Sequence, residues 1–193
     1  MLLFVDTETT GLPGKKCSVI NPRAHWPRMV EFAWIECEND GTVITEHDSI
    51  IKPDSFKIPR CATAIHGITT ERAQEEGCTL ISVLSEFQKT LDRCSVIVGH
   101  NVDFDVNVIN AESHRTGISL PLQLHQRICT MKSSVRLCNL KRGAGYKDPT
   151  LSELHQLLFG SSFPDSHRAL SDACACMKCF FELKRRGIFE KTQ

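Results

Sequence analysis

Strand-like and helix-like segments alternate along this chain, and that alternation limits the folds it can adopt. Apolar or β-branched runs predict strands at 2–6, 30–37, 42–51, 95–99 and 126–130. Helical spacing predicts helices at 79–91, 103–115, 131–138, 151–159 and 167–186. The turn sequence Asn39-Asp40-Gly41 predicts that the second and third strands pair as an antiparallel hairpin. Strands interspersed with helices form sheets that carry helices on their faces, so we expect an α/β fold with a mixed central sheet.

Length and composition favour one globular domain over residues 1–193. The chain contains 41% hydrophobic and 24% charged residues, which are ordinary fractions for a globular protein. It contains no internal repeat, no low-complexity tract and no linker rich in proline, glycine or serine. A chain of this length can bury a sizeable core without disulfides or structural metals. We therefore expect a single domain that folds by itself.

Charge and cysteine content indicate the compartment more than the function. The 23 basic and 23 acidic residues cancel, so net charge indicates neither nucleic-acid nor membrane binding. Ten cysteines in 193 residues are about 5%, a lower density than that of disulfide-stapled scaffolds. The apolar N-terminus lacks the basic lead of a signal peptide, and no run approaches the roughly 18 apolar residues of a membrane span. We expect a cytoplasmic protein with no membrane partner and with reduced thiols, most of them packed in the core.

Two acids follow the apolar run of the first predicted strand. Alternate residues of a strand share a face, so Asp6 and Glu8 are expected to continue the face of Phe4. Leu3 and Val5 are expected on the opposite face. Buried carboxylates are costly unless they are paired, and divalent cations commonly compensate them. The strand therefore predicts a cation site at its end, unless both acids are solvated where the chain enters a turn.

A second acidic segment, His100 to Asp105, lies where a predicted strand passes into a helix. Asn101 is placed to cap that helix, and Asp103 and Asp105 fall in its first turn. The helix dipole favours acids at this position. Ordinary helix N-terminal chemistry therefore explains this segment, taken alone, better than a functional site does.

A third segment begins the last predicted helix, with Ser166 as the expected N-cap. Asp172 starts a stripe of otherwise apolar residues at helical spacing, which continues through Cys176 to Leu183. An acid on an inward stripe needs a partner or a metal. His167, at the mouth of this helix, can serve as a general base. A histidine at a helix end and a solvated acid are the simpler interpretation of each residue alone.

Taken together, the three segments resemble a known family. "DTETTG", "HNVDFD" and "HRALSD" are similar, in this order, to the three exonuclease motifs of the DEDD superfamily. The histidine five residues before the last aspartate resembles the DEDDh branch, in particular the DnaQ-like proofreading exonucleases of bacterial DNA polymerase III and their stand-alone relatives. Weaker similarity extends the resemblance over most of the chain, at 26–34, 65–69 and 151–160.

The resemblance implies an RNase H-like fold and a 3′–5′ exonuclease that releases nucleoside monophosphates. Four acids match the metal ligands of the family, Asp6, Glu8, Asp105 and Asp172, and His167 matches its general base. These five are the catalytic residues that the resemblance implies. Asp103 is not selected, because the family pattern places the ligand directly after the phenylalanine. The implied cofactors are two divalent cations, Mg²⁺ or Mn²⁺, which suit an all-carboxylate site.

The resemblance also implies a partner, the 3′ end of a single-stranded DNA or RNA. It assigns six residues to substrate binding: Thr9, Leu12, His66, His100, Asn101 and Phe104. Leu12 and Phe104 match positions that pack against the terminal bases, a sequence-tolerant contact. Core packing is an equally good interpretation of Phe104, and His100 and Asn101 are expected to support the site rather than to catalyse. The choice of DNA or RNA stays open, as does a polymerase or a second copy of the chain as partner.

Two other functions fit the same fold. A catalytically silent nucleic-acid-binding module is the main alternative, since fold alone does not establish activity. Such a module is expected to have lost a metal ligand or the histidine, and all five residues are present here. An RNase H-like endonuclease is the third possibility, which the spacing of "HRALSD" disfavours.

A small basic segment remains outside these motifs. Lys141, Arg142 and Lys147 lie in a predicted loop that either contacts phosphates or is simply solvated. Cys174, Cys176 and Cys179 also suggest a metal site, but on a helix the three do not converge. We interpret them as packing residues.

Overall fold

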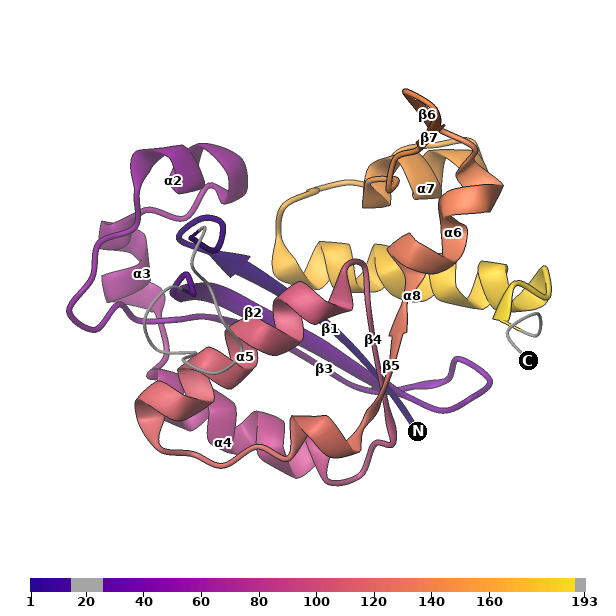
Figure 1. Cartoon of the computed structure of the whole chain (residues 1–193). Helices are drawn as coiled ribbons and strands as arrows, with labels where there is room; N and C mark the ends of the chain where they lie inside the picture. Colours follow the sequence, from indigo (N-terminus) through magenta and orange to yellow (C-terminus); the bar gives the residue numbers. More distant parts are fainter. Residues whose placement is uncertain (15–25, 190–193) are drawn as a thin grey trace.

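A mixed five-stranded sheet forms the centre of the computed structural model, which describes residues 1–14 and 26–189. The strand order is β3-β2-β1-β4-β5. The strands are β1 (Leu2–Thr9), β2 (Met29–Cys37), β3 (Val43–Ile50), β4 (Val96–Gly99) and β5 (Gln126–Cys129). β1 pairs antiparallel with β2 on one side and parallel with β4 on the other (Figure 1). The expected mixed sheet is confirmed, and so is the β2–β3 hairpin.

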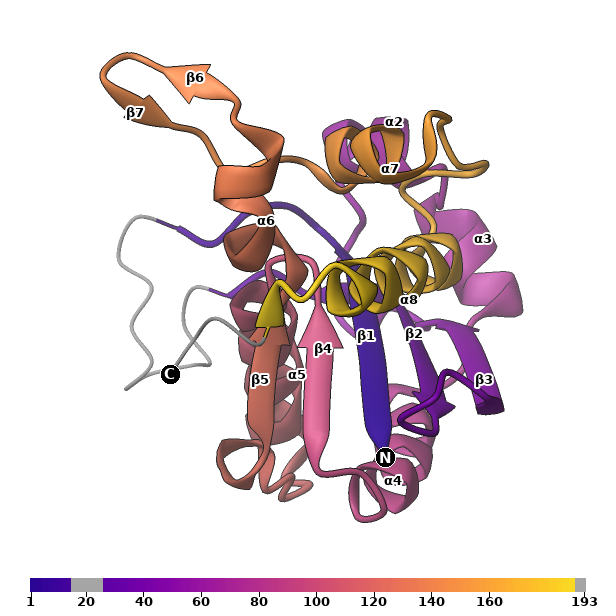
Figure 2. The same cartoon turned by 90° about the vertical axis from the view of Figure 1, so that its right-hand side faces the viewer.

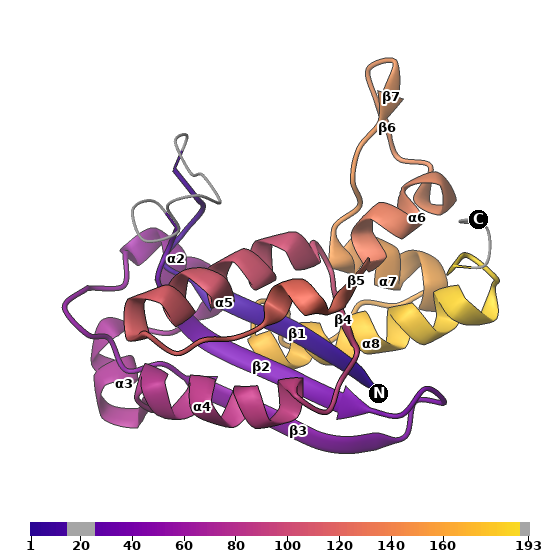
Figure 3. The same ribbon diagram turned by 60° about the horizontal axis from the view of Figure 1, so that its bottom comes forward.

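Helices cover both faces of this sheet (Figures 1 and 3). One face carries α4 (Leu80–Leu91) and α5 (Val102–Thr116), and the other carries α7 (Leu151–Phe159) and α8 (Ala169–Arg185). α6 (Thr130–Cys138) contacts both α7 and α8. The alternation predicted for β1 is confirmed: Leu3 and Val5 belong to the core under α4 and α5, and Leu2 and Phe4 belong to the core under α8. The sheet therefore separates two apolar layers.

The first strand is longer than the apolar run predicts. It continues to Thr9 because β2 supplies partners along its whole length, with Glu8 paired to Glu31 and Thr9 to Met29. The parallel partner β4 pairs only with Leu2–Phe4. The end of β1 that carries Asp6 and Glu8 therefore has β2 on one side and is not paired with β4 on the other.

Several short elements escaped the sequence interpretation. These are α2 (Arg60–His66), α3 (Thr70–Glu76), the 3-10 turn η1 (Leu122–Leu124) and a hairpin of β6 (Lys141–Arg142) and β7 (Gly145–Tyr146). Helices of seven residues are too short to establish a period of 3.6, so no apolar stripe indicates them. α2 and α3 pack around a third small core that includes Val30 and Ile68. The predicted basic loop is thus a β-hairpin.

The two expected N-caps have different outcomes: Asn101 stands at the N-cap position of α5 but does not cap the helix with its side chain, and Ser166 is not the N-cap of α8. Asn101 adopts a left-handed conformation (φ 75°), and its side chain makes no capping hydrogen bond. The last helix begins at Ala169 rather than at 167, because His167 also has a positive φ of 70°. Ser166 therefore does not cap it. The carboxylate of Glu31 on β2 accepts the Ala169 N–H instead, at 2.9 Å, so a residue distant in sequence does the work of a cap.

The cysteines agree in part with expectation. All nine within the described residues are free, and four of them are buried: Cys37, Cys94, Cys176 and Cys179. Cys61 and Cys78 are exposed, so packing in the core holds for fewer thiols than expected. Across residues 1–14 and 26–189, none of the helices combines the length and the apolar character that crossing a bilayer requires.

Candidate active site

The first turn of α5 lies against the free edge of β1. The carboxylate of Asp105 accepts two hydrogen bonds at Oδ1, one from the Thr7 backbone N–H at 3.0 Å and one from Thr7 Oγ1 at 2.8 Å. The Thr7 N–H is available because β4 has already ended its pairing at Phe4. These contacts hold a buried acid from α5 beside the strand that carries Asp6 and Glu8.

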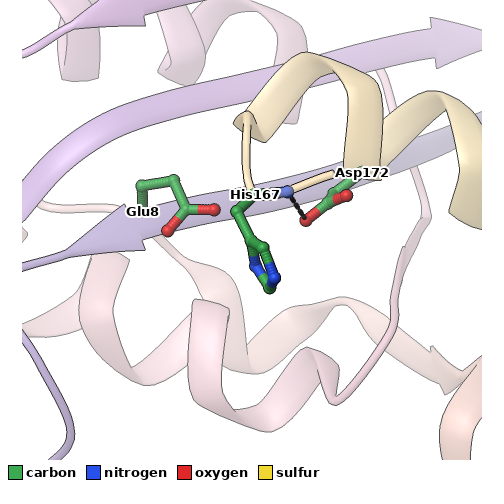
Figure 4. A group of neighbouring side chains, drawn as sticks. All are labelled: Glu8, His167 and Asp172. Atoms are coloured by element: carbon green, nitrogen blue, oxygen red, sulfur yellow. Dashed lines mark hydrogen bonds between the residues drawn. The ribbon is translucent and has the colours of Figure 1, made fainter. Parts of the chain in front are cut away.

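The start of α8 brings a third element to the same place. Figure 4 shows Glu8 of β1 facing His167 and Asp172. One ligand atom from each of these three residues lies within 4.8 Å of the others. The His167 backbone N–H donates to Asp172 Oδ2 at 3.2 Å, so the turn before α8 is held to the acid in its first turn. The His167 side chain is exposed and accessible from solvent.

An ion pair anchors this turn to β2. Arg168 donates from Nε and Nη2 to Glu31 Oε1, at 2.9 and 2.6 Å, while the second oxygen of Glu31 accepts the Ala169 N–H. Glu31 is completely buried. The residue that follows His167 is thereby fixed to the sheet. No role was assigned to Glu31 from the sequence, although an acid within a mostly apolar strand indicates a buried carboxylate that needs a partner.

Four carboxyl groups meet here with little positive charge. Burial raises the pKa of Glu8 to about 8, of Asp105 to about 7 and of Asp172 to about 6, and neighbouring carboxylates add to each effect. Burial and the charges of Asp105 and Asp172 raise the pKa of Asp6 well above its ordinary range. Asp172 Oδ1 is buried without a hydrogen-bond partner among the described residues. A cluster of oxygen donors that lacks countercharge fits hard divalent cations such as Mg²⁺ or Mn²⁺.

Asp103 lies in a different environment from Asp105. Its carboxylate pairs with Lys132 at 2.5 Å and with Arg127 at 3.5 Å, and it is partly exposed. The hydrogen bond from Lys132 lowers the pKa of Asp103. Asp103 is therefore an ion-paired surface residue, while Asp105 lies in the carboxylate cluster.

A pocket of about 440 Å³ adjoins Glu8. Four of the six residues expected to bind substrate line it: Thr9, Leu12, His66 and Phe104. Ala62 and Ile65 of α2 add apolar surface to its wall. The side chain of Leu12 is 87% exposed, so it is accessible to an apolar ligand. Phe104 also packs on the core and on the Trp26 ring (centroids 6.1 Å apart), so it is both a core residue and part of the pocket wall.

The other two expected substrate residues do not line this pocket. His100 forms hydrogen bonds through both ring nitrogens, with Thr130 Oγ1 at 3.0 Å and with the Pro149 carbonyl at 2.9 Å. It joins the turn before α5 to the start of α6 and to the segment before α7. Asn101 is exposed in that turn. His100 therefore links three segments of the fold near the site.

Comparison with known proteins identifies the family. A family model described as an exonuclease, RNase_T, matches residues 3–180. The chain belongs to the RNase_T exonuclease family. The expected membership of the DEDD superfamily of 3′–5′ exonucleases is thereby confirmed, and so is the enzyme class.

Two curated relatives of this RNase_T exonuclease are similar to it over most of its length. It is 31% identical over 181 residues to the DNA polymerase III subunit epsilon of Treponema pallidum (strain Nichols), covering 91% of this chain and 72% of the relative. It is 28% identical over 183 residues to the 3′-5′ exonuclease DinG of Bacillus subtilis (strain 168), covering 94% of this chain but 17% of that relative.

Solved structures support the fold. E. coli exonuclease I in complex with a dT13 oligonucleotide superposes with a TM-score of 0.77 at 22% identity, and the match covers 98% of this chain. The same enzyme with a dA16 oligonucleotide gives a TM-score of 0.75 at 20% identity. In both cases this RNase_T exonuclease spans 42% of the other chain's length. The expected RNase H-like α/β architecture is confirmed.

Proposed function

We propose that this protein is a metal-dependent 3′–5′ exonuclease that removes nucleoside monophosphates from single-stranded nucleic acid. One observation carries the proposal. Four carboxyl groups with little positive charge around them lie beside an exposed histidine, at the end of the central strand. A cluster of this kind destabilises the folded protein unless it binds cations. Metal-dependent exonuclease activity would explain why the acids lie together, because the bound cations would take part in hydrolysis.

Asp6, Glu8, Asp105 and Asp172 would hold the cations. When bound, two divalent cations would neutralise the carboxylates, lower the pKa of a coordinated water and stabilise charge on the scissile phosphate. Asp172 Oδ1, which is buried and unpartnered among the described residues, is a ligand atom already in place. Asp105 is oriented by its two hydrogen bonds from Thr7 and keeps Oδ2 for a ligand contact.

His167 acts as the general base. The attacking water forms a bond to phosphorus and its proton passes to the His167 imidazole. The bond from phosphorus to the 3′ oxygen of the preceding nucleotide breaks, and that oxygen takes up a proton from solvent water to become a 3′-hydroxyl. The exposed imidazole can reach a substrate, while the Asp172 carboxylate and the Glu31–Arg168 pair hold the backbone on both sides of it. The side chain therefore works from a turn whose position is set by α8 and β2.

The pocket beside Glu8 receives the terminal nucleotide. Its walls, with Leu12, Ile65 and Phe104, are mostly apolar and suit the flat face of a base. Stacking and apolar contact do not distinguish one base from another, which suits an enzyme that degrades any sequence. Thr9 and His66 are polar groups of this wall, together with Thr7 and Glu8.

Single-stranded DNA is the substrate that the relatives favour. The most similar curated proteins include a DNA polymerase III subunit, and exonuclease I has been solved with dA16 and dT13 oligonucleotides. A zinc-bound form of the exonuclease I complex with single-stranded DNA is also known, so zinc belongs among the cations tested. A polymerase partner is suggested only by the epsilon relative.

A gel time course with 5′-labelled single-stranded DNA and RNA oligonucleotides tests the proposal. We expect a ladder that shortens from the 3′ end with Mg²⁺ or Mn²⁺, faster on DNA than on RNA, and no cleavage in EDTA. A folded protein that binds the oligonucleotide but cuts neither substrate with any cation would instead be a silent binding module. Cleavage of circular single strands would indicate an endonuclease.

A further inference from the structure

The β6–β7 hairpin projects from the body of the molecule (Figures 2 and 3). It rises at the same edge of the sheet to which β4 points in Figure 2, and therefore from the edge at which the parallel strand β1 ends in the active site. The segment 139–147 contains three basic residues and no acid. Every residue from Lys141 to Tyr146 is exposed.

The base of this hairpin is fixed to the rest of the fold. Lys147 donates its backbone N–H to the Leu140 carbonyl at 2.9 Å and its ammonium to Glu153 of α7 at 2.5 Å. The Pro149 carbonyl is hydrogen bonded to His100, four residues before Phe104 in the pocket wall. The hairpin is thus attached to the same turn that leads into the active-site helix α5.

Two basic residues of the hairpin are not paired with an acid within the described residues. Within the described residues, Lys141 and Arg142 form no ion pair, whereas Lys147 is neutralised by Glu153 and Lys132 by Asp103. The Lys141 ammonium lies 4.0 Å from the centre of the Tyr146 ring, which is 49% exposed. The hairpin therefore presents two positive charges that are not paired with an acid, beside a half-exposed aromatic ring.

We propose that the β6–β7 hairpin binds the polynucleotide strand upstream of the nucleotide being removed. Lys141 and Arg142 contact its phosphates, and Tyr146 stacks on one of its bases. Free cations next to an aromatic ring are the combination with which proteins hold single strands without reading sequence. This inference rests on the proposed function, because the strand must enter from the active-site edge of the sheet.

Charge-reversal variants and a small substrate distinguish an effect on the hairpin from an effect on the active site. The variants are Lys141→Glu/Arg142→Glu, Tyr146→Ala and its conservative control Tyr146→Phe. Lys89→Glu/Lys184→Glu makes the same change in net charge on α4 and at the end of α8, away from the hairpin. Each is assayed on a 20-nucleotide single-stranded DNA and on the p-nitrophenyl ester of thymidine 5′-monophosphate, which occupies only the active site.

We expect the charge-reversal variant to lose most of its kcat/KM on the 20-mer and to hydrolyse the ester like the wild type. The slope of log kcat/KM against log salt concentration should become shallower by about 1.4, since each phosphate contact on a single strand contributes about 0.7. Tyr146→Ala should lose about fivefold or more on the 20-mer, and Tyr146→Phe should not. Unchanged 20-mer kinetics and salt slope in the charge-reversal variant would overturn the proposal.

Binding measured in EDTA tests the hairpin proposal separately from the proposed exonuclease activity. Fluorescence anisotropy with a labelled 20-mer reports the hairpin contact even if the wild type cleaves nothing. Weaker binding by Lys141→Glu/Arg142→Glu than by Lys89→Glu/Lys184→Glu would support the hairpin surface independently of activity. Equal binding by the two variants would refute it, whatever the outcome of the cleavage assay.

Discussion

Asp103 and Asp105 lie two residues apart on the first turn of α5 and occupy opposite environments. Asp103 points to Arg127 and Lys132 at the surface, and Asp105 accepts both hydrogen bonds that Thr7 offers from the central strand. A helix turns by about 100° per residue, so two positions change the direction of a side chain by more than half a turn. At the residue scale, the local direction decides which of two identical side chains belongs to the site.

This pair provides a matched test. Asp105→Asn should lower kcat by at least about 10³-fold, because it removes a charged ligand from the cation site. Asp103→Asn should stay within about threefold of wild type, since it breaks only partly exposed ion pairs. Steady-state cleavage of a labelled oligonucleotide measures both. Equal losses in the two variants would contradict the assignment of Asp105.

His167 should be separable from the cation ligands. We expect His167→Ala to lower kcat by about 10²–10⁴-fold, the usual effect of removing a general base, and to leave cation binding near wild type. Isothermal titration with Mn²⁺ and single-turnover cleavage report the two properties separately. Loss of Mn²⁺ binding would show that the imidazole is a ligand, as its distance from Glu8 and Asp172 also permits.

At the scale of elements, the junction between β2 and α8 positions the base. The Glu31 carboxylate accepts hydrogen bonds from Arg168 and from the first N–H of α8. A single buried side chain thus caps the N-terminus of the helix and orients the turn before it. His167 keeps a positive φ of 70° in that turn, which is uncommon for a residue other than glycine. Such backbone conformations persist where the surrounding contacts determine them.

Breaking this junction should cost stability as well as rate. Glu31→Gln keeps the size of the side chain but leaves Arg168 without its charge partner. We expect the free energy of unfolding to fall by about 2–3 kcal/mol, the lower end for a buried pair because Arg168 is partly exposed. Arg185→Gln, which breaks an exposed pair on the same helix, should leave the free energy of unfolding close to that of the wild type.

Urea unfolding followed by circular dichroism compares the two variants of the preceding test. A lower kcat with an unchanged KM in Glu31→Gln would mark it as a positioning residue for His167. If Glu31→Gln proves as stable and as active as Arg185→Gln, the junction does not position the base.

At the scale of the whole molecule, the two helical layers and the sheet bring acids from β1, α5 and α8 to one edge. Each raised pKa means that the folded protein binds a proton more tightly than the unfolded chain does. The stabilisation that follows is present at low pH and is lost as pH rises through the folded-state values, about 6 to about 8. Cations that bind the ionised acids should restore it.

Thermal unfolding across pH tests this balance. In EDTA we expect Tm to fall by about 5 °C or more between pH 5 and pH 8, and excess Mg²⁺ to remove most of that fall. The Asp105→Asn/Asp172→Asn variant should show a flatter profile in EDTA, because two of the titrating groups are gone. A Tm in EDTA that is constant or rises over this interval would refute the picture of an unpaired carboxylate cluster.

Local sequence patterns predicted most of the fold. The positions of the five main strands along the chain follow from their apolar or β-branched runs, and those of α4 to α8 follow from helical spacing. The two faces of β1 follow from its alternation, since neighbouring side chains on a strand point in opposite directions. The acids and the histidine were predicted through the resemblance of three sequence motifs to those of a known family, and the structure brings Glu8, His167 and Asp172 together.

Other features were decided only by the tertiary structure. Glu31 and Arg168 lie 137 positions apart, and no local pattern reports a contact over that distance. Asn101 and His167 both adopt a positive φ that no local pattern indicated, and Glu31 rather than Ser166 accepts the first N–H of α8. The pocket also depends on α2, a helix too short to be read from its sequence. The chain sequence thus determined which groups could do chemistry, through local geometry, while packing between distant segments decided where they lie and what holds them.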